Sequence, residues 1–269
     1  MSKTIQPTFF LSHGGGPWPW LIEDMPFMNG LHGALVQVVK DLSAKPEAIV
    51  IVSGHWEEKE VGIMSAERPG MIYDYSGFPE HTYKVKYPAP GNPQLADKIR
   101  ELFAANGIKS HLNTERGYDH GTYSLLYPMF PEADIPVVQV SLRSDYDPKA
   151  HIQMGKALKG LRGEGVLIVG SGNLFHNMRA MQNCRKESYE FDKWMREVLL
   201  SKDINYRMSQ IIDWEKAPYA RFCQPSEDHL APLFVTVGAA GDDLGELVYG
   251  EPLFGRVSIS SFKFSKDTK

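Results

Sequence analysis

Histidines are the residues of this sequence with the clearest chemical potential, and five of the nine stand in short motifs at turns. These are His13 in LSHGGG, His55 in VSGHW, His120 in GYDHG, His176 in GSGNLFHN and His229 in SEDHL. A neutral imidazole is the commonest protein ligand of transition metals, and it is also a general acid or base near neutral pH. The five motifs therefore favour a metal centre assembled from distant parts of the chain.

Three of these histidines follow predicted strands. His13 and His55 come directly after apolar runs, and His176 comes six residues after Gly170, at the end of a third run. Ligands of open α/β sheets bind in the crevice beyond the carboxyl ends of the strands, so the three side chains can converge there.

Short apolar runs that are rich in β-branched residues predict five strands. They are Thr8–Leu11, Ala48–Ser53, Pro136–Leu142, Val166–Val169 and Val257–Phe264. The middle three consist largely of Val and Ile, as expected for strands that are covered on both faces. The last run alternates apolar with smaller residues, which favours a strand at the edge of the sheet.

Apolar residues at helical spacing predict the helices. The stripes are Leu31–Leu42, Leu95–Phe103, Phe191–Leu199 and, more weakly, Ile152–Leu161. Residues 230–240 indicate a buried helix, with Val235 and Val237 also compatible with a strand. Helices and strands alternate from end to end, which predicts a single α/β domain over residues 1–269. Its central sheet should be mostly parallel or mixed with helices on both faces, and a metal site should lie at the carboxyl ends of the strands.

The other histidines have less distinctive surroundings. His32 and His151 fall at polar positions of predicted helices and should be solvated, whereas His111 is expected in a loop. His81 is expected to have a structural role.

Composition limits the classes of function. The 269 residues are 42% hydrophobic and 23% charged with a net charge of −4, which is typical of a globular protein and argues against a nucleic-acid-binding surface. No stretch approaches the roughly 20 apolar residues of a membrane-spanning helix, and the N-terminus lacks the apolar run of a signal peptide. Cys184 and Cys223 form no CxxC pair, so a reducing, cytoplasmic setting is expected. No pattern in the sequence assigns an oligomeric state.

Three other catalytic motifs fit poorly. Gly14-Gly15-Gly16 follows a strand, but Pro17 comes next, and neither phosphate-binding glycine spacing is present. Gly170-Ser171-Gly172 lacks the GxSxG spacing of a serine hydrolase, and the HExxH motif of zinc proteases is absent.

Seven segments together resemble the signature blocks of a known enzyme family. In order, they are Ser12–Gly14, Ser53–Trp56, Tyr83–Gly91, Gly117–Gly121, Ala133–Leu142, Gly170–Asn177 and Glu227–Leu230. They resemble the extradiol aromatic ring-opening dioxygenases of the DOPA-dioxygenase type, within the class III extradiol superfamily (protocatechuate 4,5-dioxygenase β-subunit-like). The matches run from residue 12 to residue 230 and so cover most of the chain.

The resemblance implies cleavage of a catechol ring next to its hydroxyls, with O₂ and non-haem Fe(II), and Zn(II) as another occupant of the site. It implies that His13, His55 and His229 are metal ligands. His176 would be a fourth ligand or the acid–base group beside the metal, and His120 would lie near the substrate and O₂. The chain departs from the family at Gly15–Trp20, where many members have Ser-Pro, and at Asn173, where small residues are also common.

These implications agree with elementary chemistry. Three neutral imidazoles leave a divalent iron with open positions, as oxygenases require, and a nearby imidazole can accept a catechol proton. We assign the proton transfer to His176 and the orientation or protonation of the oxygen-bound intermediate to His120. Asp119 and Glu227 are candidates to hold the ligand rings, because metal-bound histidines usually donate their second nitrogen to an acceptor.

Aromatic side chains beside the motifs predict the wall of the substrate pocket: Trp18, Trp20, Tyr123 and Phe175. Two other functions use the same residues. A zinc hydrolase would activate water with these ligands and would not need O₂. A non-catalytic binding protein would keep the fold and bind a partner in the cleft.

Overall fold

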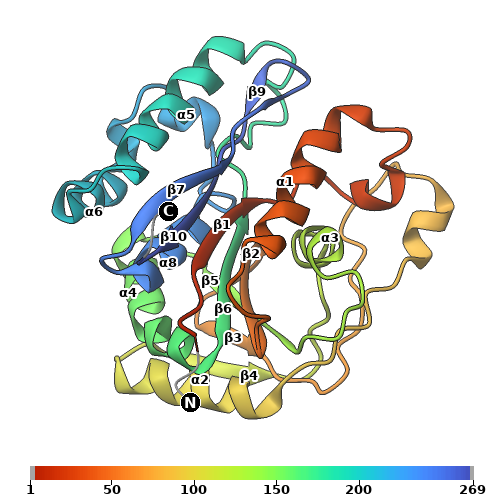
Figure 1. Cartoon of the computed structure of the whole chain (residues 1–269), viewed down its shortest axis with the longest axis vertical. Coiled ribbons are helices and arrows are strands. Elements are labelled where there is room, and N and C mark those ends of the chain that lie inside the picture. Colours follow the sequence, from red (N-terminus) through yellow and green to blue (C-terminus); the bar gives the residue numbers. More distant parts are fainter. Residues whose placement is uncertain (1–3, 267–269) are drawn as a thin grey trace.

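The computed structural model describes residues 4–266, and its centre is one mixed sheet of eight strands (Figure 1). The strand order is β4-β3-β5-β2-β6-β1-β10-β7. The strands are β1 Thr8–Ser12, β2 Ala48–Glu58, β3 Val61–Met64, β4 Ser110–Asn113, β5 Val137–Arg143, β6 Val166–Gly172, β7 Leu244–Tyr249 and β10 Ser261–Ser265. Two short strands, β8 Pro252–Leu253 and β9 Val257–Ser258, form a separate hairpin.

The four central strands β5, β2, β6 and β1 are parallel neighbours and are almost entirely buried. The Val- and Ile-rich runs predicted these strands, since a strand covered on both faces needs no polar side. The prediction of an edge strand at Val257–Phe264 was wrong. This segment forms both β9 and β10, and β10 lies between β1 and β7 in antiparallel pairing.

Eight α-helices surround the sheet in the described residues. They are α1 Asn29–Lys40, α2 Pro93–Ala105, α3 His120–Met129, α4 Pro148–Leu158, α5 Arg185–Leu199, α6 Ile204–Ile212, α7 Ala220–Cys223 and α8 Ala231–Ala240. α2 begins at residues that favour a helix start: the side chain of Asn92 accepts a hydrogen bond from the Leu95 backbone amide, and Pro93 is the first helical residue. The helix expected at residues 230–240 is α8, and every residue of it is buried.

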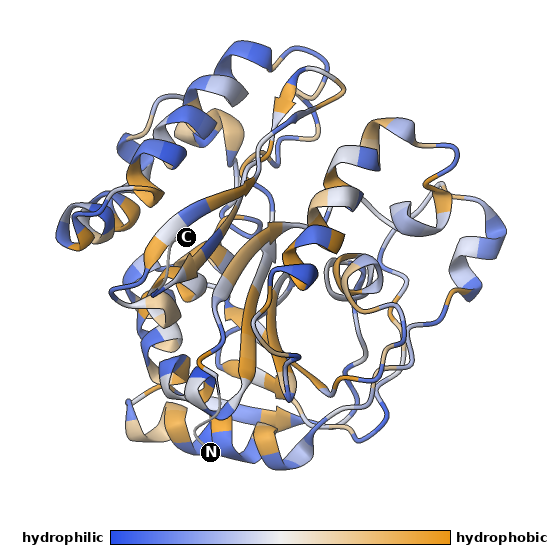
Figure 2. Cartoon of the chain, viewed as in Figure 1, coloured by the Kyte–Doolittle hydropathy of each residue, from blue (hydrophilic) through white to orange (hydrophobic). Residues whose placement is uncertain are grey.

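The helices cover both faces of the sheet. Adjacent residues of β6 point in opposite directions: Gly170 contacts Thr236 of α8, whereas the Ser171 hydroxyl donates a hydrogen bond to the Gly121 carbonyl of α3. The central strands are largely apolar, whereas the helices carry both polar and apolar residues (Figure 2). The α/β class with a mixed sheet is therefore confirmed.

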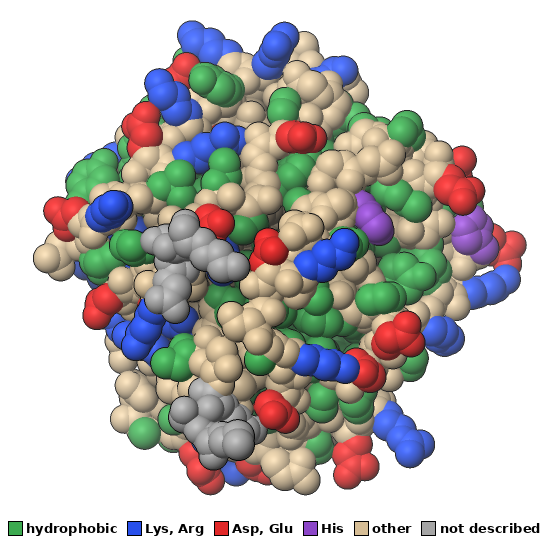
Figure 3. All heavy atoms as spheres, in the orientation of Figure 1, with side chains coloured by type: hydrophobic (Ala, Val, Ile, Leu, Met, Phe, Trp, Pro, Cys, Tyr) green, Lys and Arg blue, Asp and Glu red, His purple; other side chains and the backbone are tan. Residues whose placement is uncertain are grey.

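Charged side chains of both signs are interspersed over the face of the molecule shown in Figure 3. Among residues 4–266, none of the helices has the length and apolar character that a membrane span needs.

Two segments project beyond the carboxyl ends of the central strands. One is the stretch Met25–Met28, which includes a short 3₁₀ helix before α1, and the other is the β8–β9 hairpin. The rings of Phe27 and Phe254 join them, with centroids 4.3 Å apart. Together they form the rim above the site described next.

Candidate metal centre

Three histidine side chains from distant parts of the chain converge at the carboxyl ends of the central strands. Nε2 of His55 lies 3.3 Å from Nε2 of His13 and 3.2 Å from Nε2 of His229. The three ring centroids lie 4.7 to 5.1 Å from one another. The arrangement presents three nitrogen lone pairs to one small volume.

The parallel strands explain how these residues meet. His13 directly follows β1, whereas His55 lies within β2, which extends beyond the predicted end at Ser53. The pairing of β2 with β5 is interrupted between Val52 and Glu57, so His55 stands in an irregular stretch of the strand. Such irregularities turn a side chain away from the regular pleat, here towards the end of the sheet.

His229 comes from the turn before α8 and is held against the end of β6. A Cβ atom at Gly172 would overlap the carbonyl oxygen of His229, so glycine allows the two backbones to touch. The Asn173 amide also donates a hydrogen bond to this carbonyl, at 3.0 Å. On the other side, Gly14 has a φ of +71° and turns the chain away directly after His13.

The second ring nitrogen of each histidine has an acceptor. Nδ1 of His229 lies 2.7 Å from Oδ2 of Asp228, and Nδ1 of His55 lies 3.3 Å from Oδ2 of Asp74. Nδ1 of His13 lies 3.0 Å from the Ser171 hydroxyl, whose own proton is donated to a carbonyl. These acceptors favour the tautomer with hydrogen on Nδ1, which leaves Nε2 free to bind a metal.

Burial keeps the three imidazoles neutral. Desolvation, assisted by the neighbouring histidines, holds the pKa of His13 and that of His55 well below 6.5. Desolvation also lowers the pKa of His229, to about 4, although the hydrogen bond to Asp228 opposes it. Neutral imidazole is the form that ligates a metal.

His120 and His176 lie beside these three rings. The His120 ring is 3.9 Å from that of His55, and its Nδ1 lies 2.9 Å from Oδ1 of Asp74. The His176 ring stacks on His229 with centroids 3.3 Å apart, and its Nδ1 lies 3.5 Å from Oδ2 of Asp228.

Two carboxylates thus each serve two histidines. Burial alone would raise the pKa of Asp74, but the hydrogen bond and charge of His120 lower it to about 2. Burial likewise opposes ionisation of Asp228, and hydrogen bonds from His176 and His229 lower its pKa well below the usual range. Both groups are therefore ionised acceptors at neutral pH.

A cavity of about 400 Å³ opens above the histidines. All five histidines line it, together with Asn173 and the backbone of Gly14–Gly16. Apolar residues form the rest of the lining. Apart from Trp18, we call these residues the apolar wall: Met25, Phe27, Met28, Phe78, Phe175, Met178, Met181, Leu253, Phe254, Val257 and Ile259. The site therefore has a polar floor and an apolar wall.

Known proteins are similar to this chain in sequence and in fold. Residues 21–258 match the family model described as the catalytic LigB subunit of aromatic ring-opening dioxygenase. The chain belongs to this family. A "4,5-DOPA dioxygenase extradiol" of Beta vulgaris is 37% identical over 97% of both chains. "Dioxygenase tasH" of Hapsidospora irregularis is 36% identical over 89% of this chain and 79% of its own.

A solved structure is similar as well. The crystal structure of an uncharacterized protein from Escherichia coli K12 superposes with a TM-score of 0.80 at 29% identity, over 97% of this chain and 100% of that one. The resemblance to extradiol dioxygenases of the DOPA type is thus confirmed, and with it an enzyme that opens aromatic rings.

Some of the surroundings of this LigB-family site differ from the prediction. Trp18 and Phe175 line the cavity as expected, but Trp20 stacks on Tyr127 away from it, with centroids 4.4 Å apart. Tyr123 also lies outside the lining and donates a hydrogen bond to the Ile72 carbonyl.

The acceptors of the histidine rings are not the two acids that neighbour the motif histidines in sequence. Asp119 accepts hydrogen bonds from the Thr122 amide and the Ser53 hydroxyl, and Glu227 pairs with Arg221, so neither contacts these rings. The acceptors are Asp74, Asp228 and Ser171. Adjacency to His229 could have indicated Asp228, whereas no local pattern marks Asp74, which lies in an irregular segment.

Two of the remaining histidines also differ from expectation. His151 is completely buried: its Nδ1 donates to the Asp147 carbonyl, and its Nε2 accepts from the Arg143 amide. His111 belongs to β4, where its Nε2 lies 3.1 Å from Oε2 of Glu58. Both histidine side chains therefore contact residues outside the metal centre.

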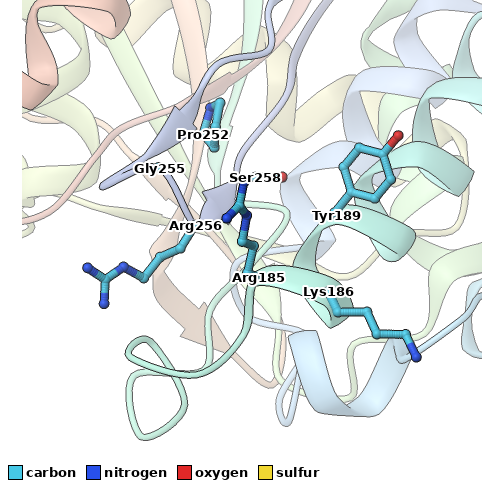
Figure 4. A pocket seen from close by; sticks show the side chains of 7 residues that line it. All are labelled: Arg185, Lys186, Tyr189, Pro252, Gly255, Arg256 and Ser258. Carbon is cyan, nitrogen blue, oxygen red and sulfur yellow. The ribbon is translucent and has the colours of Figure 1, made fainter.

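A second cavity, of about 500 Å³, lies on the other side of the β8–β9 hairpin (Figure 4). It is lined by Arg185, Lys186, Tyr189, Pro252, Gly255, Arg256 and Ser258. The hairpin therefore separates the two cavities. Its apolar residues face the histidines, and the basic cavity lies on its other side.

Proposed function

We propose that this chain cleaves the ring of a catechol-type substrate with O₂ at a single divalent ion held by His13, His55 and His229. The convergence of three Nε2 atoms supports this most directly. Two nitrogens bound to one ion at ~2.0–2.1 Å in tetrahedral geometry lie about 3.3–3.4 Å apart. The separations of His55 Nε2 from His13 Nε2 and from His229 Nε2, 3.3 and 3.2 Å, agree with this requirement.

The donor set suits the ion that the reaction needs. We propose Fe(II) for activity, and Zn(II) also fits three imidazoles. When bound, the ion would lower the pKa of the catechol hydroxyls and supply the redox chemistry of O₂.

His176 is our candidate for the group that accepts a substrate proton. It lines the cavity, and the Asp228 carboxylate lies near its Nδ1, so Nε2 remains available as a base. The carboxylate would stabilise the imidazolium that results. A role as a fourth ligand is the alternative, and loss of metal on substitution of His176 would distinguish it.

His120 is our candidate for the group that orients O₂ or donates a proton to the reacting oxygen. Asp74 holds its Nδ1, which fixes the ring beside His55 at the floor of the cavity. With substrate bound, the surrounding apolar wall would keep water away from it, which would strengthen such contacts.

We further propose that the whole chain, residues 1–269, acts as one catalytic domain in a reducing, cytoplasmic compartment. The family match over residues 21–258 supports the first point. The second is supported by Cys184 and Cys223, which are both buried free thiols. An aromatic diol and O₂ would be its only partners in the reaction.

Anaerobic reconstitution with Fe(II), followed by O₂ and a panel of catechols that includes DOPA and protocatechuate, tests the proposal. We expect O₂ uptake equal to the catechol consumed and a ring-opened product that absorbs visible light. Turnover that proceeds equally well without O₂ would instead identify a metal-dependent hydrolase.

A further inference from the structure

The cavity above the histidines contains no charge that could pair with a charged substrate. Among residues 4–266, none of the Asp, Glu, Lys or Arg side chains lines it. Resting on the function proposed above, we propose that the substrate is a catechol with an uncharged, apolar substituent. Several relatives are named for DOPA, a catechol whose substituent carries an ammonium and a carboxylate. The present cavity does not match such a substituent.

The distribution of polar groups fixes which end of the substrate lies where. The histidines and Asn173 are on the floor, so the two hydroxyls of the catechol belong there. A cavity of about 400 Å³ holds more than one ring, and ligands of such cavities bury most of their surface. The substituent must then lie along the apolar wall, where a charge without a partner is strongly disfavoured.

The carboxylates near the floor are already engaged. Asp74 binds His120 and lies beside His55, and Asp228 binds His229 and lies beside His176. Neither belongs to the lining of the cavity, so we expect neither to pair with the ammonium group of an amino acid bound there.

A group of basic side chains lies behind the hairpin. Arg116 lies near the floor, where its guanidinium donates to the His55 carbonyl at 3.1 Å and pairs with Asp119, but it does not line the cavity. Phe254 and Val257 face the histidine cavity, whereas Gly255 and Arg256 line the second cavity, together with Arg185 (Figure 4). The Arg256 guanidinium is also occupied: it donates to Oε1 of Gln182 at 2.7 Å and to the Phe254 carbonyl at 3.4 Å. The hairpin therefore separates these cations from any substrate carboxylate.

The apolar character continues to the rim. Phe27 and Phe254 contact each other there and are 39% and 45% exposed, and Met178 is 68% exposed. Four of the wall residues are methionines, whose flexible thioethers adapt to substituents of different shape. Exposed apolar side chains gathered around an opening mark a binding site for an apolar group.

Four catechols with similar substituents at the same ring position test the inference. They are 4-propylcatechol, which is neutral, dopamine, which is a cation, 3-(3,4-dihydroxyphenyl)propionate, which is an anion, and DOPA, which is a zwitterion. With the Fe(II)-loaded enzyme, we expect kcat/KM for 4-propylcatechol to exceed that for each charged compound by at least about tenfold. Dissociation constants for the Zn(II)-loaded protein, measured by anaerobic calorimetry, should follow the same order.

A charge placed on the wall should change this preference. Met178→Arg puts a guanidinium at the rim, and we expect it to raise kcat/KM for the propionate relative to 4-propylcatechol by about tenfold. Leu200→Arg is the matched control, because Leu200 is 38% exposed and lies outside the cavity lining. The control should keep the wild-type preference.

The outcomes separate this inference from the proposed function. If DOPA or another charged catechol is cleaved and bound as well as 4-propylcatechol, the inference is overturned, while ring cleavage itself stands. If no catechol is cleaved, the proposed function fails, and the calorimetric order alone decides whether the cavity prefers a neutral substituent.

Discussion

At the scale of single residues, the site depends on carboxylates that hold histidines. Asp74 and Asp228 each contact two rings, so four of the five histidines in the cavity are oriented by only two acids. An ionised acceptor on Nδ1 fixes the tautomer and makes Nε2 a stronger donor to a metal. The acids should therefore matter almost as much as the ligands themselves.

Asp228→Asn keeps the shape of the side chain but removes the charge opposite His229. We expect the affinity for Fe(II) or Zn(II) to fall by about 10- to 100-fold, as is typical for the loss of such a partner. Competition with a chelator measures this. Asp134→Asn is the control, since that carboxylate pairs with Lys45 on the surface, and an unchanged affinity in Asp228→Asn would argue against our assignment.

Substitution of single histidines separates ligands from proton-transfer groups. His13→Ala and His55→Ala should lose both metal and turnover. His176→Ala should keep the metal and lose about 10²- to 10⁴-fold in kcat, the usual contribution of a general base. Metal content and steady-state kinetics provide the readout, with His111→Ala on β4 as the control. Loss of metal from His176→Ala would make it a ligand instead.

At the scale of elements, the parallel strands bring together residues that are far apart in sequence. The strands β1, β2 and β6 could be predicted because buried parallel strands are continuous apolar runs. The convergence of His13 and His55 followed from the rule that strand ends form the binding crevice. The place of His229 came from the resemblance alone, since it precedes a helix and follows no strand.

Other elements lacked a local signal. The strands β3, β4 and β7 are only four to six residues long, too short to show a clear apolar pattern, and their pairing with distant strands decides their conformation. α3 was missed because Pro128 interrupts it and nine of its ten residues are buried, so it shows no polar face. For the same reason His151 was misplaced: a polar position in a helical stripe can be buried when partners such as the Asp147 carbonyl satisfy it.

The close approach of β6 to the turn before α8 should make the stability of the protein and its metal binding depend on Gly172. In Gly172→Ala, the added methyl group would push the His229 carbonyl away and displace its ring. We expect a loss of about 1–3 kcal/mol in the free energy of unfolding and weaker metal binding. Gly160→Ala is the matched control, because a Cβ atom there meets no neighbour within 4 Å. Equal stability and affinity of both variants would contradict the proposed packing.

At the scale of the whole molecule, buried neutral histidines should make the metal-free protein sensitive to acid. Desolvation lowers the pKa of His13, His55, His229 and His151 in the folded state below 6.5. Below pH 6.5 the unfolded chain therefore binds more protons than the folded one, and stability falls as the pH falls. The low pKa values of Asp74 and Asp228 act in the same direction only below about pH 3.8.

We expect the free energy of unfolding of the metal-free protein to decrease as the pH falls from 7 to 5. Each histidine that stays neutral in the folded state contributes up to about 1.4 kcal/mol per pH unit to this slope. Urea denaturation at a series of pH values measures this slope. A stability that is constant or rises towards pH 5 would show that these imidazoles are not buried in the neutral form.

The central claim is that one ion binds Nε2 of His13, His55 and His229. A crystal of the Fe(II)-loaded protein, with anomalous diffraction recorded at the iron edge, tests it most directly. We predict a single peak about 2.0–2.3 Å from each of the three Nε2 atoms. His13, His55 and His120 have ligand atoms that lie within 4.8 Å of one another, and Asp228, His176 and His229 form a second such group. A peak at that group, or at any place away from the three Nε2 atoms, would contradict the account.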